Sequence, residues 1–95
     1  LQDLDNFLAK CKANKIVPIL GLWDLTCQSD ATLLNAQLIP WWTSEPVLAV
    51  LKKHQQYLIV NPANELGVYR WADNSEEALE AYKTSYQNAI ASIRQ

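Results

Sequence analysis

The sequence predicts an α/β fold, in which helices alternate with parallel strands. Residues 16–24 (IVPILGLWD) and 57–63 (YLIVNPA) are short, rich in branched side chains and apolar at successive positions. Such segments are typical of strands that are covered on both faces. Amphipathic segments precede, separate and follow these two strands. The resulting order of helix, strand, helix, strand and helix is the one that a parallel sheet requires.

The first two helices are predicted from periodicity and from signals at their ends. Residues 1–13 place four apolar side chains on one helical face: Leu4, Phe7, Leu8 and Cys11. Residues 44–56 begin with Ser44, a favoured N-cap residue, and carry Pro46 in the first turn, where a missing N–H costs little.

The third helix is predicted over residues 74–95. It begins with Asn74 and Glu77 at the spacing of a capping box. Its apolar face consists of Leu79, Tyr82, Tyr86, Ile90 and Ile93.

The connection between the first strand and the middle helix, residues 25–44, is long and is therefore a candidate functional loop. Crossovers between parallel strands are nearly always right-handed, so residues 57–63 should lie beside residues 16–24 with the middle helix over one face. Two strands leave unpaired edges, and we expect further strands to come from a longer parent chain or from a neighbouring copy. The missing initiator Met also indicates a part of a longer protein.

Composition excludes several classes of protein. The chain has 95 residues, of which 49% are hydrophobic and 19% charged, and its net charge is −2. This suits one small folded domain. No apolar run reaches the roughly 18 residues of a membrane span, and no basic surface is expected. We therefore predict neither a membrane nor a nucleic-acid partner.

No cofactor and no metal are predicted. Gly21 and Gly67 are the only glycines, too few for a glycine-rich turn around a phosphate. His54 is the only histidine and has no cysteine near it in sequence, so a metal would lack a ligand set, and His54 is predicted to be an exposed residue at a helix end. Cys11 and Cys27 are separated by a strand and are predicted to be free thiols.

Polar side chains follow both predicted strands at their carboxyl ends, where parallel α/β folds place ligands. Trp23 and Asp24 end the first strand, and Asn64 and Glu65 end the second. Structural alternatives stay open, because a carboxylate after a strand is often a solvated loop residue or a turn former.

These residues resemble a known family. The strand VPILGLWD, the pair Trp41 and Trp42 before a helix, and the run VLAVLKKHQQYLIVNPANELG are similar to strand three through helix four of family 5 glycoside hydrolases. These enzymes are (β/α)8 barrels of the cellulase and mannanase type. The resemblance implies a partial TIM barrel, with residues 1–95 as a single, incomplete segment of the roughly 250 residues that such a barrel needs.

The resemblance also implies a chemistry and its residues. Glu65 would be the general acid/base and Asn64 its neighbour at the sugar 2-hydroxyl, in the retaining hydrolysis of a β-1,4-linked polysaccharide such as cellulose or mannan. That mechanism needs an acid that protonates the departing oxygen, and a second carboxylate about 5 to 5.5 Å away that attacks the sugar. The residues themselves leave the location of the protein open, and the resemblance implies that the protein is secreted.

Four other residues are candidate substrate contacts: Trp23, Asp24, Trp42 and Trp71. Aromatic rings can stack on the apolar faces of sugars, although large aromatic residues also often cover a core.

The sequence departs from the family pattern at three places. The nucleophile of the family lies on strand seven, beyond these residues. Trp23 stands where the third strand usually ends with a His, and Leu66 follows Glu65 where Pro is common. We therefore expect the 95 residues alone not to hydrolyse a polysaccharide, and the alternative function is that of a non-catalytic carbohydrate-binding or self-assembling barrel fragment.

Overall fold

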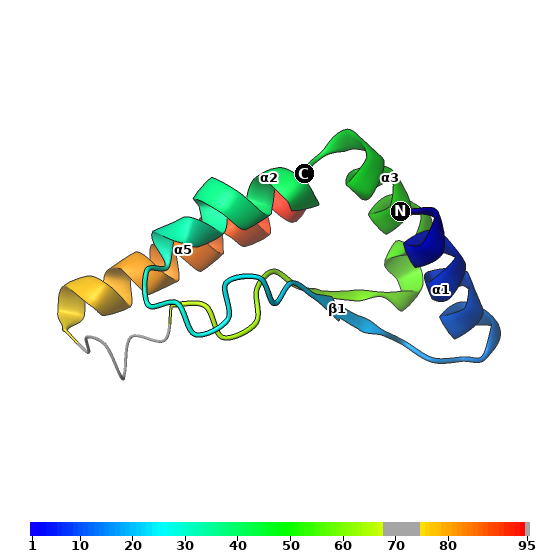
Figure 1. Ribbon diagram of the computed structural model, residues 1–95, viewed down its shortest axis with the longest axis horizontal. Helices are drawn as coiled ribbons and strands as arrows, with labels where there is room; N and C mark the ends of the chain where they lie inside the picture. Colours follow the sequence, from blue (N-terminus) through cyan, green and yellow to red (C-terminus); the bar gives the residue numbers. More distant parts are fainter. Residues whose placement is uncertain (68–74, 95) are drawn as a thin grey trace.

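The computed structural model describes residues 1–67 and 75–94, and it shows helices combined with two parallel strands (Figure 1). The predicted order of elements is confirmed: α1 (Gln2–Ala13), β1 (Ile19–Gly21), α3 (Glu45–His54), β2 (Ile59–Asn61) and α5 (Glu76–Arg94). The strands pair in parallel, with Ile19 opposite Ile59 and Gly21 opposite Asn61. The predicted pairing is therefore confirmed, although only three residues of each apolar segment form the sheet.

The predicted loop between the first strand and the middle helix is helical in its second half. A π-helix, η1 (Leu34–Leu38), continues into the short helix α2 (Ile39–Trp42). A 3₁₀ turn, η2 (Gln55–Tyr57), joins α3 to β2. The prediction of a loop was wrong here because its apolar residues are core residues, and burying them favours helix over an exposed connection.

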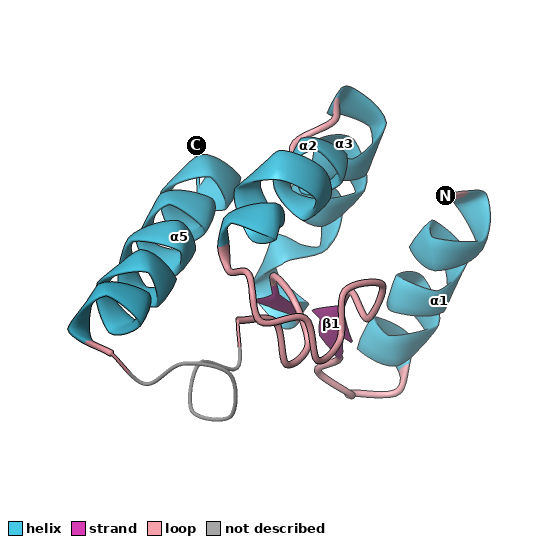
Figure 2. Ribbon diagram, turned by 60° about the vertical axis from the view of Figure 1, so that its left-hand side comes forward, coloured by secondary structure: helices cyan, strands magenta, loops and turns pink. Residues whose placement is uncertain are grey.

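The hydrophobic core lies between the helices and one face of the sheet (Figure 2). Leu20 of β1 and Val60 of β2 pack against this core. The core consists of Leu34, Leu38, Ile39, Trp42, Val47, Leu51, Ala63, Leu66 and Ala89.

The other face of the sheet is open. Ile19 is 69% exposed and its partner Ile59 is 52% exposed. Side chains at alternate positions of a strand point to opposite faces, so the open face carries every second residue of β1 and β2. The prediction that the strands are covered on both faces is wrong for the described residues, because the helices cover only one.

Helix α5 packs on η1 and α2 through small residues. Ser85 and Ala89 are its buried positions, while Ile90 of the predicted apolar face is exposed. Small side chains let the helices approach closely, and the Asn35 side-chain amide donates a 2.8 Å hydrogen bond to the carbonyl oxygen of Ser85. At the N-terminus of α5, the Ser75 hydroxyl accepts a hydrogen bond from the N–H of Ala78. The predicted capping residue Asn74 lies outside the described residues.

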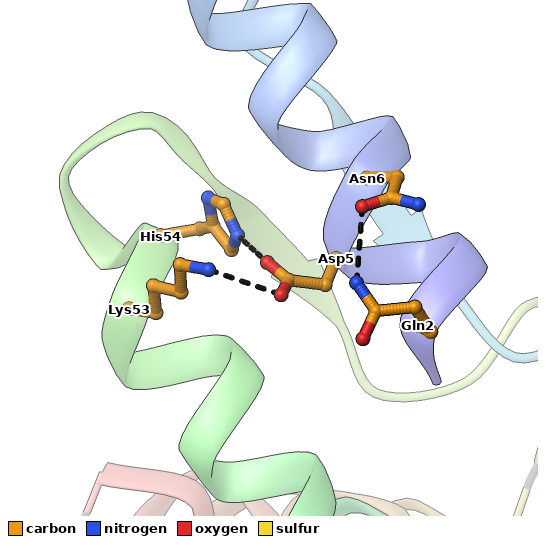
Figure 3. A network of polar contacts seen from close by, with 5 residues as sticks. All are labelled: Gln2, Asp5, Asn6, Lys53 and His54. Atoms are coloured by element: carbon orange, nitrogen blue, oxygen red, sulfur yellow. Dashed lines mark hydrogen bonds and ion pairs between the residues drawn. The ribbon is translucent and has the colours of Figure 1, made fainter.

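Helix α1 is joined to α3 by a buried histidine and an acidic residue (Figure 3). His54 Nε2 lies 2.6 Å from Asp5 Oδ1, and Lys53 Nζ donates to Asp5 Oδ2 at 3.0 Å. His54 is buried, so the prediction of an exposed histidine was wrong. The hydrogen bonds from His54 and then Lys53 lower the pKa of Asp5 below 3.8, its ordinary value.

This contact predicts a pH dependence of stability. A carboxyl group whose pKa is lowered on folding stabilises the protein above its unfolded pKa, near 3.8, and the contribution is lost as the pH falls through the lower folded pKa. Asp5→Asn should therefore lower the melting temperature at neutral pH and flatten the acid decline, as measured by circular dichroism at several pH values. Asp3→Asn is the matched control, because Asp3 is exposed in the same first turn of α1. Equal effects of both variants would show that the helix dipole, and not the contact with His54, is responsible.

Candidate functional site

The carboxyl ends of the two strands remain side by side beyond the sheet. Three backbone hydrogen bonds join the segments that follow: Asn64 N–H to Leu22 C=O at 2.8 Å, Cys27 N–H to Glu65 C=O at 2.9 Å, and Gly67 N–H to Gln28 C=O at 2.7 Å. These bonds hold the segment after β1 against the segment after β2. The structure therefore brings together the two strand ends that the sequence predicts as a site.

A tight turn after β1 is linked to Asn64. The backbone N–H and the hydroxyl of Thr26 both donate to the carbonyl oxygen of Trp23, at 3.1 and 2.7 Å. The side-chain amide of Asn64 donates to the Thr26 hydroxyl at 3.4 Å. Asn64 is half-buried by this arrangement, and its side chain is oriented by the turn.

Glu65 and Cys27 form a pair beside the same two strand ends. The Cys27 thiol lies 3.5 Å from Oε2 of Glu65, and both side chains are exposed. Both residues have positive φ angles, 69° for Cys27 and 49° for Glu65, in the left-handed region that few residues other than glycine adopt. The local backbone therefore turns sharply at both residues, and the hydrogen bond between them fixes the turned segments to each other.

The pairing affects the acidity of the thiol. The hydrogen bond to Glu65 raises the pKa of Cys27 above 9.0, its ordinary value, and desolvation and the charge of Glu65 act in the same direction. The thiol stays protonated near neutral pH and donates to the carboxylate. No sequence pattern predicts this pair, because the two residues are 38 positions apart.

We expect the reactivity of Cys27 to report on this contact. Thiolate is the species that iodoacetamide alkylates, so a raised pKa slows the reaction at a given pH. Glu65→Gln should speed alkylation of Cys27 at pH 8 and shift the pH midpoint of the rate downwards, as measured by mass spectrometry of the labelled peptide. Glu45→Gln, an exposed carboxylate on α3, is the control. An unchanged midpoint in Glu65→Gln would contradict the contact.

The tryptophans occupy different environments. Trp23 is 67% exposed beside the strand end, and Asp24 next to it is also exposed. Trp42 is 0% exposed, and its indole N–H donates to the carbonyl oxygen of Pro62 at 2.8 Å. The prediction of Trp42 as a substrate contact is corrected, because its ring is part of the core and has no face open to a ligand. Trp71 lies outside the described residues.

Within the part of the chain that the structure describes, Glu65 and Trp23 form an open rim, because both side chains are exposed. A cavity of about 530 Å³ lies between β2 and the C-terminal half of α5, lined by residues such as Leu58, Val60 and Ile93, and Glu65 does not line it. Within residues 1–67 and 75–94, no three His, Cys, Asp or Glu side chains are placed to hold a metal ion. The rim offers a carboxylate, an amide and an exposed aromatic ring, which can donate a proton, form hydrogen bonds and stack on a flat apolar surface.

Comparison of the chain with protein-family models, with curated proteins and with solved structures finds no match. No helix in the described part of the chain has the length and hydropathy that crossing a bilayer requires.

Proposed function

We propose that the chain is the acid/base-bearing segment of a retaining glycoside hydrolase of the (β/α)8 class, acting on a β-1,4-linked polysaccharide such as cellulose or mannan. The observation that supports the proposal is the position of Glu65. It lies exposed at the carboxyl end of β2, in a segment that is hydrogen-bonded to the end of the neighbouring parallel strand. Parallel α/β enzymes carry their catalytic groups at this end of the strands.

Each residue of the rim has a role in the proposed reaction. Glu65 protonates the glycosidic oxygen as the bond to the sugar breaks, and then deprotonates the water that completes hydrolysis. Asn64 donates to the sugar 2-hydroxyl, Trp23 stacks on a sugar ring and Asp24 accepts from a hydroxyl. The attacking carboxylate belongs to further strands, which pair with the free edges of this two-stranded sheet.

The test is hydrolysis of a soluble β-1,4-glucan and a β-1,4-mannan. The protein assayed is this chain together with the strands that supply the second carboxylate. We expect release of reducing ends on at least one substrate, with the first product in the β configuration when followed by NMR. A first product in the α configuration would contradict the retaining mechanism. The absence of any release would contradict the proposed activity.

A carbohydrate-binding module without catalysis is the second candidate. The exposed ring of Trp23, standing where the family usually has a catalytic-site histidine, favours it. In this case Trp23→Ala should weaken binding of β-1,4-linked hexasaccharides about tenfold, and Glu65→Gln should leave it unchanged. Isothermal titration measures these affinities, and an assay for release of reducing ends from the same hexasaccharides separates the two functions, since only the hydrolase turns them over and only the hydrolase loses that turnover in Glu65→Gln.

A further inference from the structure

An apolar groove lies beside β2, between the C-terminal ends of α3 and α5, and Glu65 does not line it. Two adjoining cavities, of about 320 and about 530 Å³, make up the groove and share the side chains of Leu58, Val60 and Ile93. These three side chains are half-buried, because each packs against the core on one side only. Small-molecule sites are typically cavities of about 300–1,000 Å³ with mainly apolar walls. The groove therefore has the size and the lining of a ligand site.

The charged side chains at the groove are both cationic. Lys52 in the last turn of α3 and Arg94 in the last turn of α5 line the smaller cavity, and Arg94 also lines the larger one. Both are exposed, and neither forms an ion pair with another described residue. No Asp or Glu is among the described residues that line the groove. An anionic group can therefore approach both cations without repulsion from an acidic side chain.

We infer that the groove binds the carboxylate form of a medium-chain fatty acid. The alkyl chain packs against the open sides of Leu58, Val60 and Ile93 and removes them from water. The carboxylate accepts hydrogen bonds from Arg94, whose guanidinium group can donate two in parallel, and from Lys52. This site lies apart from the proposed hydrolytic centre and does not depend on the proposed function.

The shape of the groove favours one free alkyl chain over a membrane surface. The floor is formed by half-buried side chains of β2 and α5, which a single chain can reach from solvent. The head groups of a bilayer form a flat layer, and only the two exposed cations would meet it. A free fatty acid therefore uses both the apolar floor and the cations of the groove, and a lipid bilayer uses the cations alone.

Isothermal titration of the protein with decanoate, below its micelle concentration, tests the inference. We expect saturable binding with a Kd of about 0.1–1 mM, as for a small ligand in an open site. Octanoate has two methylene groups fewer and should bind about three- to tenfold more weakly. Decyltrimethylammonium carries the same alkyl chain with the opposite charge and should bind at least about tenfold more weakly. Methyl NMR shifts induced by decanoate should centre on Leu58, Val60 and Ile93.

Two variants change the groove at exposed positions, so we expect both to fold, as checked by circular dichroism. Arg94→Gln removes one cation and should weaken decanoate binding about threefold or more. Ile90 is 41% exposed and lines the larger cavity, so Ile90→Glu places a carboxylate beside the ligand and should remove detectable binding. Lys83→Gln is the matched control, because it removes the same charge from α5 outside the groove, and it should change the Kd by less than about twofold.

Each contrary outcome has a definite meaning. The absence of saturable decanoate binding overturns the inference. Equal affinity for decyltrimethylammonium overturns it as well, because adsorption to any apolar patch would then be the cause, and so does an equal loss in Lys83→Gln. Binding to phosphatidylglycerol vesicles without binding of free decanoate would assign the cations to a membrane surface and overturn the inference. Decanoate binding without polysaccharide hydrolysis would refute the proposed function alone, and hydrolysis without decanoate binding would refute this inference alone.

Discussion

In the proposed hydrolase, Glu65→Gln is expected to lower the rate of polysaccharide hydrolysis by about 10²–10⁴-fold while leaving substrate affinity nearly unchanged. Glutamine has the shape of glutamate and can still form hydrogen bonds, but it has no proton to give to the departing oxygen. Steady-state kinetics on glucan and mannan should therefore show a fall in kcat with a similar KM. Glu77→Gln, an exposed carboxylate in the first turn of α5, is the control and should retain full activity.

The leaving group offers a sharper test of the same role. Dinitrophenyl glycosides have a leaving group that departs without protonation, so the bond-breaking step no longer needs an acid. The deficit of Glu65→Gln in the initial burst should shrink strongly on these substrates. A deficit of equal size on natural and activated substrates would show that Glu65 is not the proton donor.

Trp42→Ala is expected to lower the free energy of unfolding by about 3–5 kcal/mol, as for other large aromatic residues in cores. Trp42 is among the largest fully buried side chains, and its indole N–H is bonded to Pro62 at the end of β2. Small domains have only about 5–15 kcal/mol of stability, so this change removes a large part of it. Urea unfolding followed by circular dichroism, at one fixed protein concentration, measures the loss.

Two further variants separate the causes of that loss. Trp42→Phe keeps most of the bulk but removes the hydrogen bond to Pro62, and should cost less than Trp42→Ala. Trp23→Ala removes a ring that is mainly in solvent and should change the free energy of unfolding by at most about 0.5 kcal/mol. If Trp23→Ala were as costly as Trp42→Ala, the buried position of Trp42 would not explain its effect.

Local signals in the sequence account for the elements that were predicted. Ser44 is the N-cap residue of α3 and Pro46 lies in its first turn, as expected. The Ser44 hydroxyl nevertheless donates to the carbonyl oxygen of Trp41 instead of capping α3, since the preceding helix ends beside it. The strand segments were found from their apolar runs, but the same runs do not show which face the helices cover.

Contacts between residues that are far apart in the sequence could not be predicted from it. His54 and Asp5 are 49 positions apart, and nothing in the order of residues indicates that α1 brings a carboxylate to the end of α3. The carboxyl ends of the strands were located because parallel pairing places them together. The thiol at Cys27 was missed because its contact depends on two sharp turns, and non-glycine residues with positive φ carry no reliable sequence signal.

The π-helix before α2 bears on how this chain tolerates changes in length. The N–H of Ile39 bonds to the carbonyl oxygen of Leu34, five residues earlier, so this turn holds one more residue than an α-helical turn. Pro40 has no N–H, and in a regular helix its ring would collide with the carbonyl of Ala36, a conflict that the wider turn relieves. Deleting one residue within η1 would restore α-helical spacing and rotate the preceding residues by about 100° relative to Trp42. The extra residue therefore sets the rotation of η1 relative to α2, and its deletion is expected to move the buried Leu34 out of the core.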